Sequence, residues 1–269
     1  MDLTESIVDL SYLTKTELLS KCEELGIKRC KSKNKDKLIE LINAKLQIQT
    51  NKNQLINDIN IDIDNENTFI DNIKETIRLY IKDGARSNSN VDYFHNCIKK
   101  HLLNLLHNKP NYSVELEYCV KSTNSSGLKK CDIVILKNNT PYIVFPVKII
   151  KTNYKQNKNN YWENLTGELQ HLMWANENLK IIPINIYMNK TPYLKQNKQI
   201  SNFENITFDD ISISNLLLSN NIACDIINYI ILVNHEVHKN DYFNKIPTIL
   251  GFNSNTPYRK ISDILEHLL

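Results

Sequence analysis

The stretch that decides the fold is residues 113–150, SVELEYCVKSTNSSGLKKCDIVILKNNTPYIVFPVKII. Apolar and polar residues alternate over 113–121, whereas 131–136 and 142–150 are mostly apolar. Alternation is typical of a strand with one buried face, and short apolar runs between turn residues are typical of buried strands. Because only four residues, 137–140, separate the last two strands, these strands are expected to pair antiparallel. The stretch therefore predicts a meander of three antiparallel strands.

Helices are expected on either side of this meander, because apolar residues recur there at helical spacing. The expected helices are 69–82, Ser89 or Asn90 to about Leu106, 160–176, 209–218 and 261–269. A further strand is expected at 180–187, and 222–237 is ambiguous. The order helix, three strands, helix, strand predicts an α/β fold with a mixed (α+β) sheet.

Composition indicates a folded, intracellular protein. The 269 residues are 41% hydrophobic and 23% charged, with a formal net charge of +3, which is a normal globular mix. The six cysteines form no Cys-x-x-Cys pair, which favours reduced thiols over a zinc site or a disulfide framework. The first residues, MDLTESIVDL, do not resemble a signal peptide, and no uncharged apolar run is long enough to span a membrane. We therefore expect a location in the cytoplasm or nucleus, not secretion.

Composition also divides the chain into three parts. Residues 1–47 hold apolar residues at helical spacing. Residues 48–67 are rich in Asn and Asp without Gly or Pro, and are interpreted as a polar linker. Residues 68–269 are long enough for one α/β domain.

The first part contains two expected helices joined by a basic loop. Thr14 and Glu17 form a capping-box pattern at the start of the first helix, and Gly26 is expected to end it. Lysines in the loop and at the start of the next helix can approach phosphate groups. The candidate DNA-binding residues are Lys28, Arg29, Lys31, Lys33, Lys35 and Lys37. The alternative is that this loop is an ordinary solvated surface.

Residues 10–47 resemble the SAP motif, a helix–extended loop–helix module that binds DNA. The matching residues are Leu13, Leu18, Leu19, Cys22, Leu25–Gly26–Ile27, Lys33–Asn34–Lys35 and Leu38–Ile39–Glu40–Leu41–Ile42. The resemblance covers about a seventh of the chain and implies that this module binds double-stranded DNA.

Two chemically suggestive residues belong to the meander. Asp132 begins the second strand, and Lys148 follows Pro146–Val147 near the end of the third. The hairpin is expected to bring both to one end of the sheet. A carboxylate can hold a divalent cation, and a lysine can orient a hydroxide aimed at phosphorus. The alternative is a salt bridge between strand ends.

This order of elements resembles the PD-(D/E)XK nuclease superfamily, and within it the type II restriction endonucleases, over roughly residues 90–190. The resemblance implies a restriction-endonuclease-like core with Mg²⁺ (or Mn²⁺) as the cofactor. It assigns Asp132 as a metal ligand, Lys148 as the catalytic lysine, and the main-chain carbonyl of Val147 as a further ligand.

The sequence departs from the family at Pro146, which stands where the family has its second acid. Some restriction endonucleases of this superfamily place that acid on the following helix, which here offers Glu168 and Glu163. Glu168 is preferred because helical spacing puts it beside the face that packs on the sheet, and Glu163 stays an alternative. Glu115 and Glu117 share one face of the first strand, so one of them could be an accessory ligand, or both could simply face solvent.

The charges around Asp132 favour a nucleic-acid partner. From Lys121 to Asn160 there are eight lysines and a single acid, Asp132. Lysines bind phosphates, and asparagines in the loop 152–161 can pair with adenine edges, although this chain uses Asn throughout. The candidate DNA-binding residues here are Lys129, Lys130, Lys155, Asn157 and Asn160.

The sequence thus predicts a metal-dependent endonuclease that hydrolyses phosphodiester bonds in double-stranded DNA, of the type II restriction kind. One alternative is a non-catalytic DNA-binding protein on a decayed nuclease core, since Pro146 replaces an acid. Another is a structure-selective nuclease for recombination or repair. A homodimer is expected if the target is palindromic.

Overall fold

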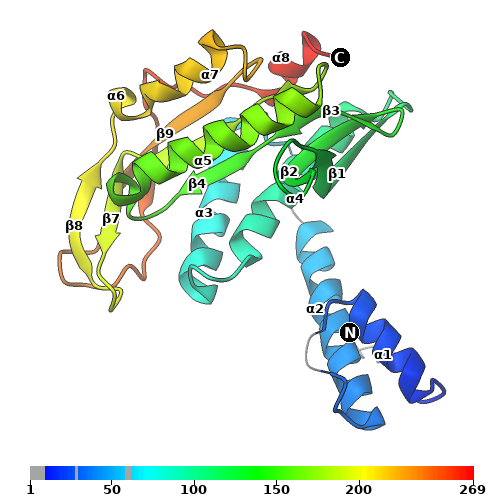
Figure 1. Cartoon of the computed structure of the whole chain (residues 1–269). Helices are drawn as coiled ribbons and strands as arrows, with labels where there is room; N and C mark the ends of the chain where they lie inside the picture. Colours follow the sequence, from blue (N-terminus) through cyan, green and yellow to red (C-terminus); the bar gives the residue numbers. More distant parts are fainter. Residues whose placement is uncertain (1–9, 28–29, 58–61) are drawn as a thin grey trace. The chain divides into compact units, whose positions relative to one another are not determined.

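The computed structural model describes residues 10–27, 30–57 and 62–269. The chain forms two compact units, Met1–Ile59 and Asn60–Leu269, and each is described by itself (Figure 1). Among the described helices, none has the length and apolar character needed to cross a membrane.

The N-terminal unit is a pair of helices, α1 (Lys15–Glu24) and α2 (Lys35–Asn57). The predicted capping box is confirmed, because the Glu17 N–H donates to the Thr14 hydroxyl and the Thr14 N–H donates to the Glu17 carboxylate at 2.7 Å. Gly26 has a φ of 66° just after α1, a left-handed conformation that glycine adopts without strain. The buried core of this unit consists of Leu10, Leu18, Cys22, Cys30, Leu38 and Ile42.

Helix α2 is longer than predicted. It continues through residues 48–57, which the sequence analysis assigned to the polar linker 48–67. That assignment is wrong over its first half, because a run without Gly or Pro contains nothing that ends a helix. Helix α3 (Glu66–Asp83) also begins before residue 67.

The first sheet of the large unit has the strand order β1-β2-β3-β5. The antiparallel meander is confirmed and consists of β1 (Tyr112–Lys121), β2 (Leu128–Lys137) and β3 (Thr140–Phe145). The short strand β5 (Lys180–Ile181) pairs parallel with β3. The mixed α/β class predicted from the sequence is therefore confirmed.

The second sheet has the strand order β10-β9-β6-β4. Its strands β4 (Val147–Ile150), β6 (Ile184–Met188) and β9 (Ile227–Asn234) are parallel, and β10 (Thr248–Phe252) is antiparallel to β9. The single strand predicted at 142–150 is thus two strands that belong to different sheets. Pro146 separates them, because proline has no N–H for the ladder.

Helices surround these sheets. Helix α4 (Ser89–Leu105) lies beside α3 and packs on β1 and β2, and α5 (Tyr154–Ala175) runs across the strands (Figure 1). The apolar face predicted for α5 is confirmed, since Trp162, Leu165, Leu169 and Leu172 are buried in the core. The C-terminal part adds α6 (Phe208–Ile211), η1 (Ser212–Ser214), α7 (Asn215–Ser219) and α8 (Ile261–Glu266).

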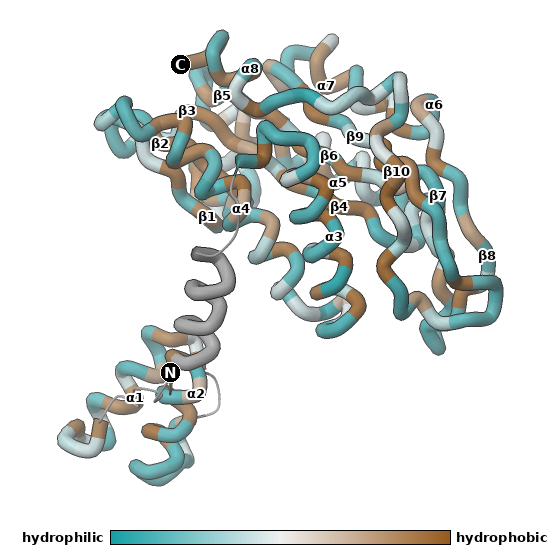
Figure 2. Tube along the Cα trace, turned by 180° about the vertical axis from the view of Figure 1, so that it is seen from behind, coloured by the Kyte–Doolittle hydropathy of each residue, from teal (hydrophilic) through white to brown (hydrophobic). Residues whose placement is uncertain are grey.

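A hairpin of β7 (Lys190–Leu194) and β8 (Ile200–Asn205) extends from the second sheet. The sequence analysis did not predict it, because its residues are mostly polar and its turn lacks glycine. Figure 2 shows the contrast between the hydrophobic central strands and this more hydrophilic hairpin.

Candidate functional site

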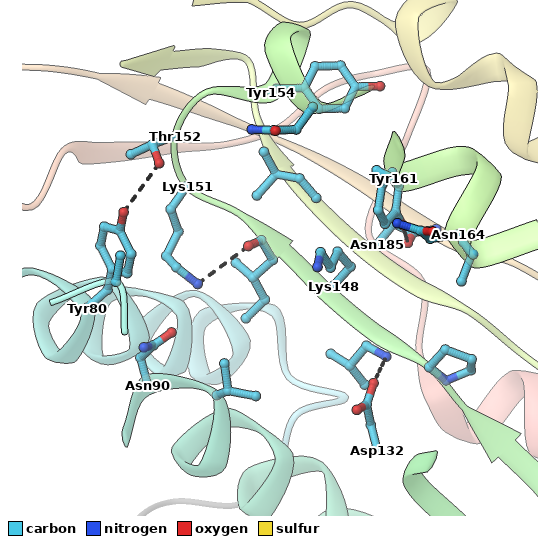
Figure 3. A pocket seen from close by; sticks show the side chains of 18 of the residues that line it. Tyr80, Asn90, Asp132, Lys148, Lys151, Thr152, Tyr154, Tyr161, Asn164 and Asn185 are labelled. Carbon is cyan, nitrogen blue, oxygen red and sulfur yellow. Dashed lines mark hydrogen bonds between the residues drawn. The ribbon is translucent and has the colours of Figure 1, made fainter. Parts of the chain in front are cut away.

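An open cavity of about 910 Å³ lies where the two sheets meet, between α4 and α5. It is lined by the end of α3, the start of α4, Asp132 of β2, all of β4 and one side of α5. Asp132, Val147, Lys148 and Glu168 all line this cavity. The structure thus brings to one place four residues that the sequence analysis selected (Figure 3).

Asp132 is fixed by the break between β3 and β4. The β2–β3 ladder ends at the pair Ile133–Phe145, and the next N–H along the chain, that of Val147, donates to the Asp132 carboxylate at 2.8 Å. A side chain thus takes the place of a ladder acceptor where Pro146 interrupts the strand. The contact observed for Val147 is through its N–H, whereas the sequence analysis assigned a role to its carbonyl.

Two further side chains lie next to Asp132. These are His95 of α4 and Glu117 of β1. A ring nitrogen of His95, a carboxylate oxygen of Glu117 and a carboxylate oxygen of Asp132 all lie within 4.8 Å of one another. Ligands of one cation lie about 2.0–2.6 Å from it, so this spacing fits one shared ion. His95 was missed by the sequence analysis because a histidine inside a helix gives no signal of its own.

Glu117 has an unusual backbone. In the β1–β2 register, Leu116 pairs with Ile133 and Tyr118 pairs with Cys131, so Glu117 lies opposite Asp132. Its φ is 55°, in the left-handed region that non-glycine residues rarely occupy inside a strand. Such strain costs about 1–3 kcal/mol and gathers at functional sites. The strained residue is thus the one that faces the predicted metal ligand.

The protonation of His95 suits a metal ligand. The side chain is 3% exposed, and this burial lowers its pKa, although Asp132 and Glu117 oppose the shift. The imidazole is therefore neutral at pH 7, the form that binds metals. Two carboxylates and one imidazole fit Mn²⁺ well and leave positions open for water and substrate, whereas Mg²⁺ prefers oxygen ligands alone.

The helix glutamates do not join this group. Glu168 forms an ion pair with Lys129 at 2.5 Å, and Glu163 is exposed and does not line the cavity. Within the described residues, neither is among the groups clustered with Asp132. The second acid beside Asp132 is thus Glu117, which the sequence offered only as an accessory ligand. Glu168 lines the same cavity as Asp132, but it is paired with Lys129 and is not clustered with Asp132, so its role as the second ligand stays a prediction.

Lys148 lies in the same cavity next to Tyr161. Its Nζ is 5.7 Å from the centre of the Tyr161 ring, and the Tyr161 hydroxyl donates a hydrogen bond to Asn185 Oδ1. Asn185 in turn donates to Asn228 at 2.9 Å, and Asn228 donates to Ser214 at 2.8 Å. This buried polar chain fixes α5 and Tyr161 on the second sheet, and burial raises the pKa of Tyr161.

The predicted DNA-binding residues of the large unit fall into three groups. Lys129 and Lys130 are paired with Glu168 and Glu117. Lys155 is exposed on α5. Asn157 and Asn160 line the cavity. The loop 152–161 on which they were placed is helical from Tyr154 onward, so both asparagines belong to α5.

In the N-terminal unit, Lys31 and Lys33 are exposed. Lys35 donates to the Ser11 carbonyl at 2.6 Å, and Lys37 pairs with Glu40 at 2.6 Å. Lys28 and Arg29 lie outside the described residues. The observed surface therefore leaves Lys31 and Lys33 as the lysines best placed for phosphate contacts.

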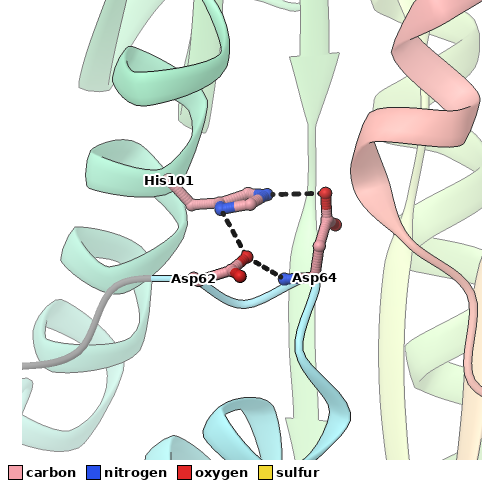
Figure 4. Close-up of side chains that lie close together, drawn as sticks. All are labelled: Asp62, Asp64 and His101. Carbon is pink, nitrogen blue, oxygen red and sulfur yellow. Dashed lines mark hydrogen bonds and ion pairs between the residues drawn. The ribbon is translucent and has the colours of Figure 1, made fainter.

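A second cluster, Asp62, Asp64 and His101, has metal-like spacing (Figure 4). Asp64 accepts hydrogen bonds from the N–H groups of Ile261 and Ser262, at 2.7 and 3.3 Å, and so caps α8. Although burial raises the pKa of Asp64, hydrogen bonds from His101 and Ser262 lower it to about 2. Asp64 thus bonds both to the start of α8 and to His101 of α4, so a structural role in holding these two helices together accounts for the cluster.

Comparison of the chain with protein-family models, with curated proteins and with solved structures gave no match.

Proposed function

We propose that this chain is a metal-dependent endonuclease that hydrolyses phosphodiester bonds in double-stranded DNA, with a restriction-endonuclease-like core and a SAP-like N-terminal module. The observation that supports this most is that His95, Asp132 and Lys148 line one open cavity, and that Glu117 joins His95 and Asp132 in a group with metal-ligand spacing. Two acids that can hold one cation, with a lysine near them, can support phosphodiester hydrolysis.

The protein residues divide the chemistry between them. His95, Glu117 and Asp132 would hold the cation, which neutralises charge on the phosphate and acidifies a water molecule. Lys148 donates hydrogen bonds to a non-bridging phosphoryl oxygen and orients the attacking water. Water adds its oxygen to phosphorus, the bond from phosphorus to one sugar oxygen breaks, and that oxygen leaves with a proton.

The experiment is cleavage of supercoiled DNA with Mn²⁺ or Mg²⁺, comparing the wild type with Asp132→Asn, Glu117→Gln and Lys148→Met. Each variant is expected to lose about 100-fold or more in rate, the usual effect of removing a group that stabilises the transition state. Glu163→Gln is the matched control, because this exposed acid lies outside the cavity. Equal cutting by the wild type and all three site variants would refute the assignment.

One observation favours a second candidate, a DNA-binding protein without nuclease activity. Lys130 pairs with Glu117, and an ammonium at that carboxylate competes with a cation. This candidate predicts salt-sensitive DNA binding without cleavage in any metal. Lys130→Gln distinguishes the two, since freeing Glu117 strengthens Mn²⁺ binding if the site is functional and has no effect if it has decayed.

The SAP-like module is proposed to hold the enzyme on DNA through Lys31 and Lys33. The logarithm of DNA affinity falls linearly with the logarithm of salt concentration, and each phosphate contact contributes about 0.9 to the steepness of that line. Each lost contact therefore makes the line shallower by about 0.9. The double variant Lys31→Gln/Lys33→Gln of the whole chain is therefore expected to bind duplex DNA more weakly and with a shallower slope. An unchanged slope contradicts this role.

A further inference from the structure

A second lysine, Lys151, lines the cavity beyond Lys148. It follows the last residue of β4, its Nζ lies 3.4 Å from the Ile149 carbonyl oxygen, and 5.1 Å from the centre of the Tyr80 ring. Among the described residues, no carboxylate forms an ion pair with Lys151 or Lys148. A largely buried ammonium without a counter-charge is costly.

The surroundings of Lys151 make this cost larger. Burial and the neighbouring charge of Lys148 lower the pKa of Lys151 to about 8. An anion placed between the two ammonium groups would relieve both effects. The cavity thus has the Asp132 carboxylate at one end and the Lys148 and Lys151 ammonium groups along β4 (Figure 3).

The start of α4 contributes to the same wall. Ser87, Asn88, Asn90 and Val91 line the cavity, and the N-cap residue Asn88 makes no side-chain hydrogen bond to the helix. The first N–H groups of a helix lack acceptors within it and carry partial positive charge. Ser87 Oγ accepts from the Ser89 N–H at 3.2 Å, and the Ser89 hydroxyl donates to the Asp83 carboxylate at 2.6 Å. The anion-binding capacity beside Lys151 therefore comes from the later N–H groups of this first turn.

Asn90 gives an independent sign that a ligand belongs here. Its side chain is 2% exposed, its Nδ2 donates to the Ser87 carbonyl at 3.1 Å, and its Oδ1 has no hydrogen-bond partner. In Figure 3 this oxygen points into the cavity on the side of Lys151. Buried polar atoms are normally satisfied. This oxygen is an acceptor, so its partner is a donor such as a water molecule that is bound together with an anion, and it does not contact the anion itself.

We propose that Lys151, beside the start of α4, forms a second phosphate subsite, which binds the backbone phosphate next to the one that is cut, with Asn90 Oδ1 accepting from a water molecule bound with that phosphate. The identification of the anion as a nucleic-acid phosphate rests on the proposed nuclease function. Lys148 and Lys151 are three residues apart, which in extended chain is about 10 Å. Their flexible side chains can therefore contact neighbouring phosphates of one strand.

The test is calorimetric binding of three probes to the whole chain with Mn²⁺: thymidine 3′,5′-bisphosphate, thymidine 5′-monophosphate and inorganic phosphate. None contains a phosphodiester, so none is consumed. The wild type is expected to bind the bisphosphate about tenfold more tightly than either other probe, the effect of one charge-assisted hydrogen bond. Equal binding of all three probes, or binding of none, overturns the subsite.

Variants assign the effect to the cavity. Lys151→Gln is expected to abolish the tenfold preference and leave monophosphate binding unchanged, whereas Lys151→Arg keeps most of it. Lys239→Gln, which removes an exposed lysine outside the cavity, is the matched control. A preference that survives in Lys151→Gln refutes the proposal. Cleavage of supercoiled DNA is scored separately, so bisphosphate binding without cleavage contradicts only the nuclease function.

Discussion

Replacing Glu117 by asparagine is expected to separate stability from metal binding. Glu117 has a φ of 55° inside β1, which costs an L-residue about 1–2 kcal/mol. Asparagine tolerates this conformation better than glutamate does. The change also removes the ion pair with Lys130, whose side chain is 61% exposed, so that loss is about 0–1 kcal/mol. The net expectation is a stability equal to the wild type or higher by up to about 1 kcal/mol.

The assay is thermal unfolding followed by circular dichroism, first in EDTA and then with Mn²⁺. For a unit of this size, 1 kcal/mol corresponds to about 2–4 °C in Tm. Glu117→Asn is therefore expected to unfold in EDTA at the wild-type Tm or a few degrees above it. Mn²⁺ at 100 times its Kd stabilises a binding protein by about 2.7 kcal/mol. The wild type should gain this shift, and the variant should lose it.

Glu115→Asn is the matched control for the backbone argument. Glu115 lies on the same strand with a regular partner, Val134, and pairs with Lys99 at 3.3 Å. Asparagine is unfavourable at ordinary strand positions. Glu115→Asn should therefore have a lower Tm than the wild type and show the same increase in Tm with Mn²⁺. If Glu117→Asn destabilises the protein as much as Glu115→Asn does, the strain argument is wrong. If Glu117→Asn keeps the full Mn²⁺ shift, Glu117 is not a ligand.

Three further outcomes are expected. Burial lowers the pKa of His95, so below about pH 6.5 the unfolded chain takes up a proton that the folded chain does not. The free energy of unfolding in EDTA should therefore decrease as the pH is lowered from 7 to 5. His95→Gln should make this decrease smaller, as measured by chemical denaturation at pH 7 and pH 5. Tyr161→Phe leaves the buried Asn185 oxygen without its donor and should cost about 1–3 kcal/mol in urea unfolding. Asp64→Ala uncaps α8 and should lower the Tm yet leave the Mn²⁺ shift intact, whereas loss of that shift would make its cluster the metal site.

The sequence predicts the part of the site that depends on local pattern. Asp132 and Lys148 were selected because alternation and a four-residue turn define a hairpin, and the structure places both in one cavity. His95 and Lys151 were missed because their roles arise from burial and from neighbours distant in sequence. From the sequence, Glu117 could be identified only as one of two acids on the same face of the first strand. The alternation of polar and apolar residues does not reveal that Glu117 has a left-handed backbone conformation.

Under the proposed nuclease function, the strand register gives a geometric reason why Pro146 can stand where an acid is expected. Asp132 lies on the middle strand of the meander and has a neighbour on each side. If the register Ile133–Phe145 is continued, the position opposite Asp132 on the β3 side is Pro146, and the position opposite it on the β1 side is Glu117. A carboxylate on either flank reaches the same space, so one acid on β1 can serve in place of one before Lys148. Proline on the other flank is then free to end β3 and direct Val147 to Asp132, which holds the carboxylate toward the cavity.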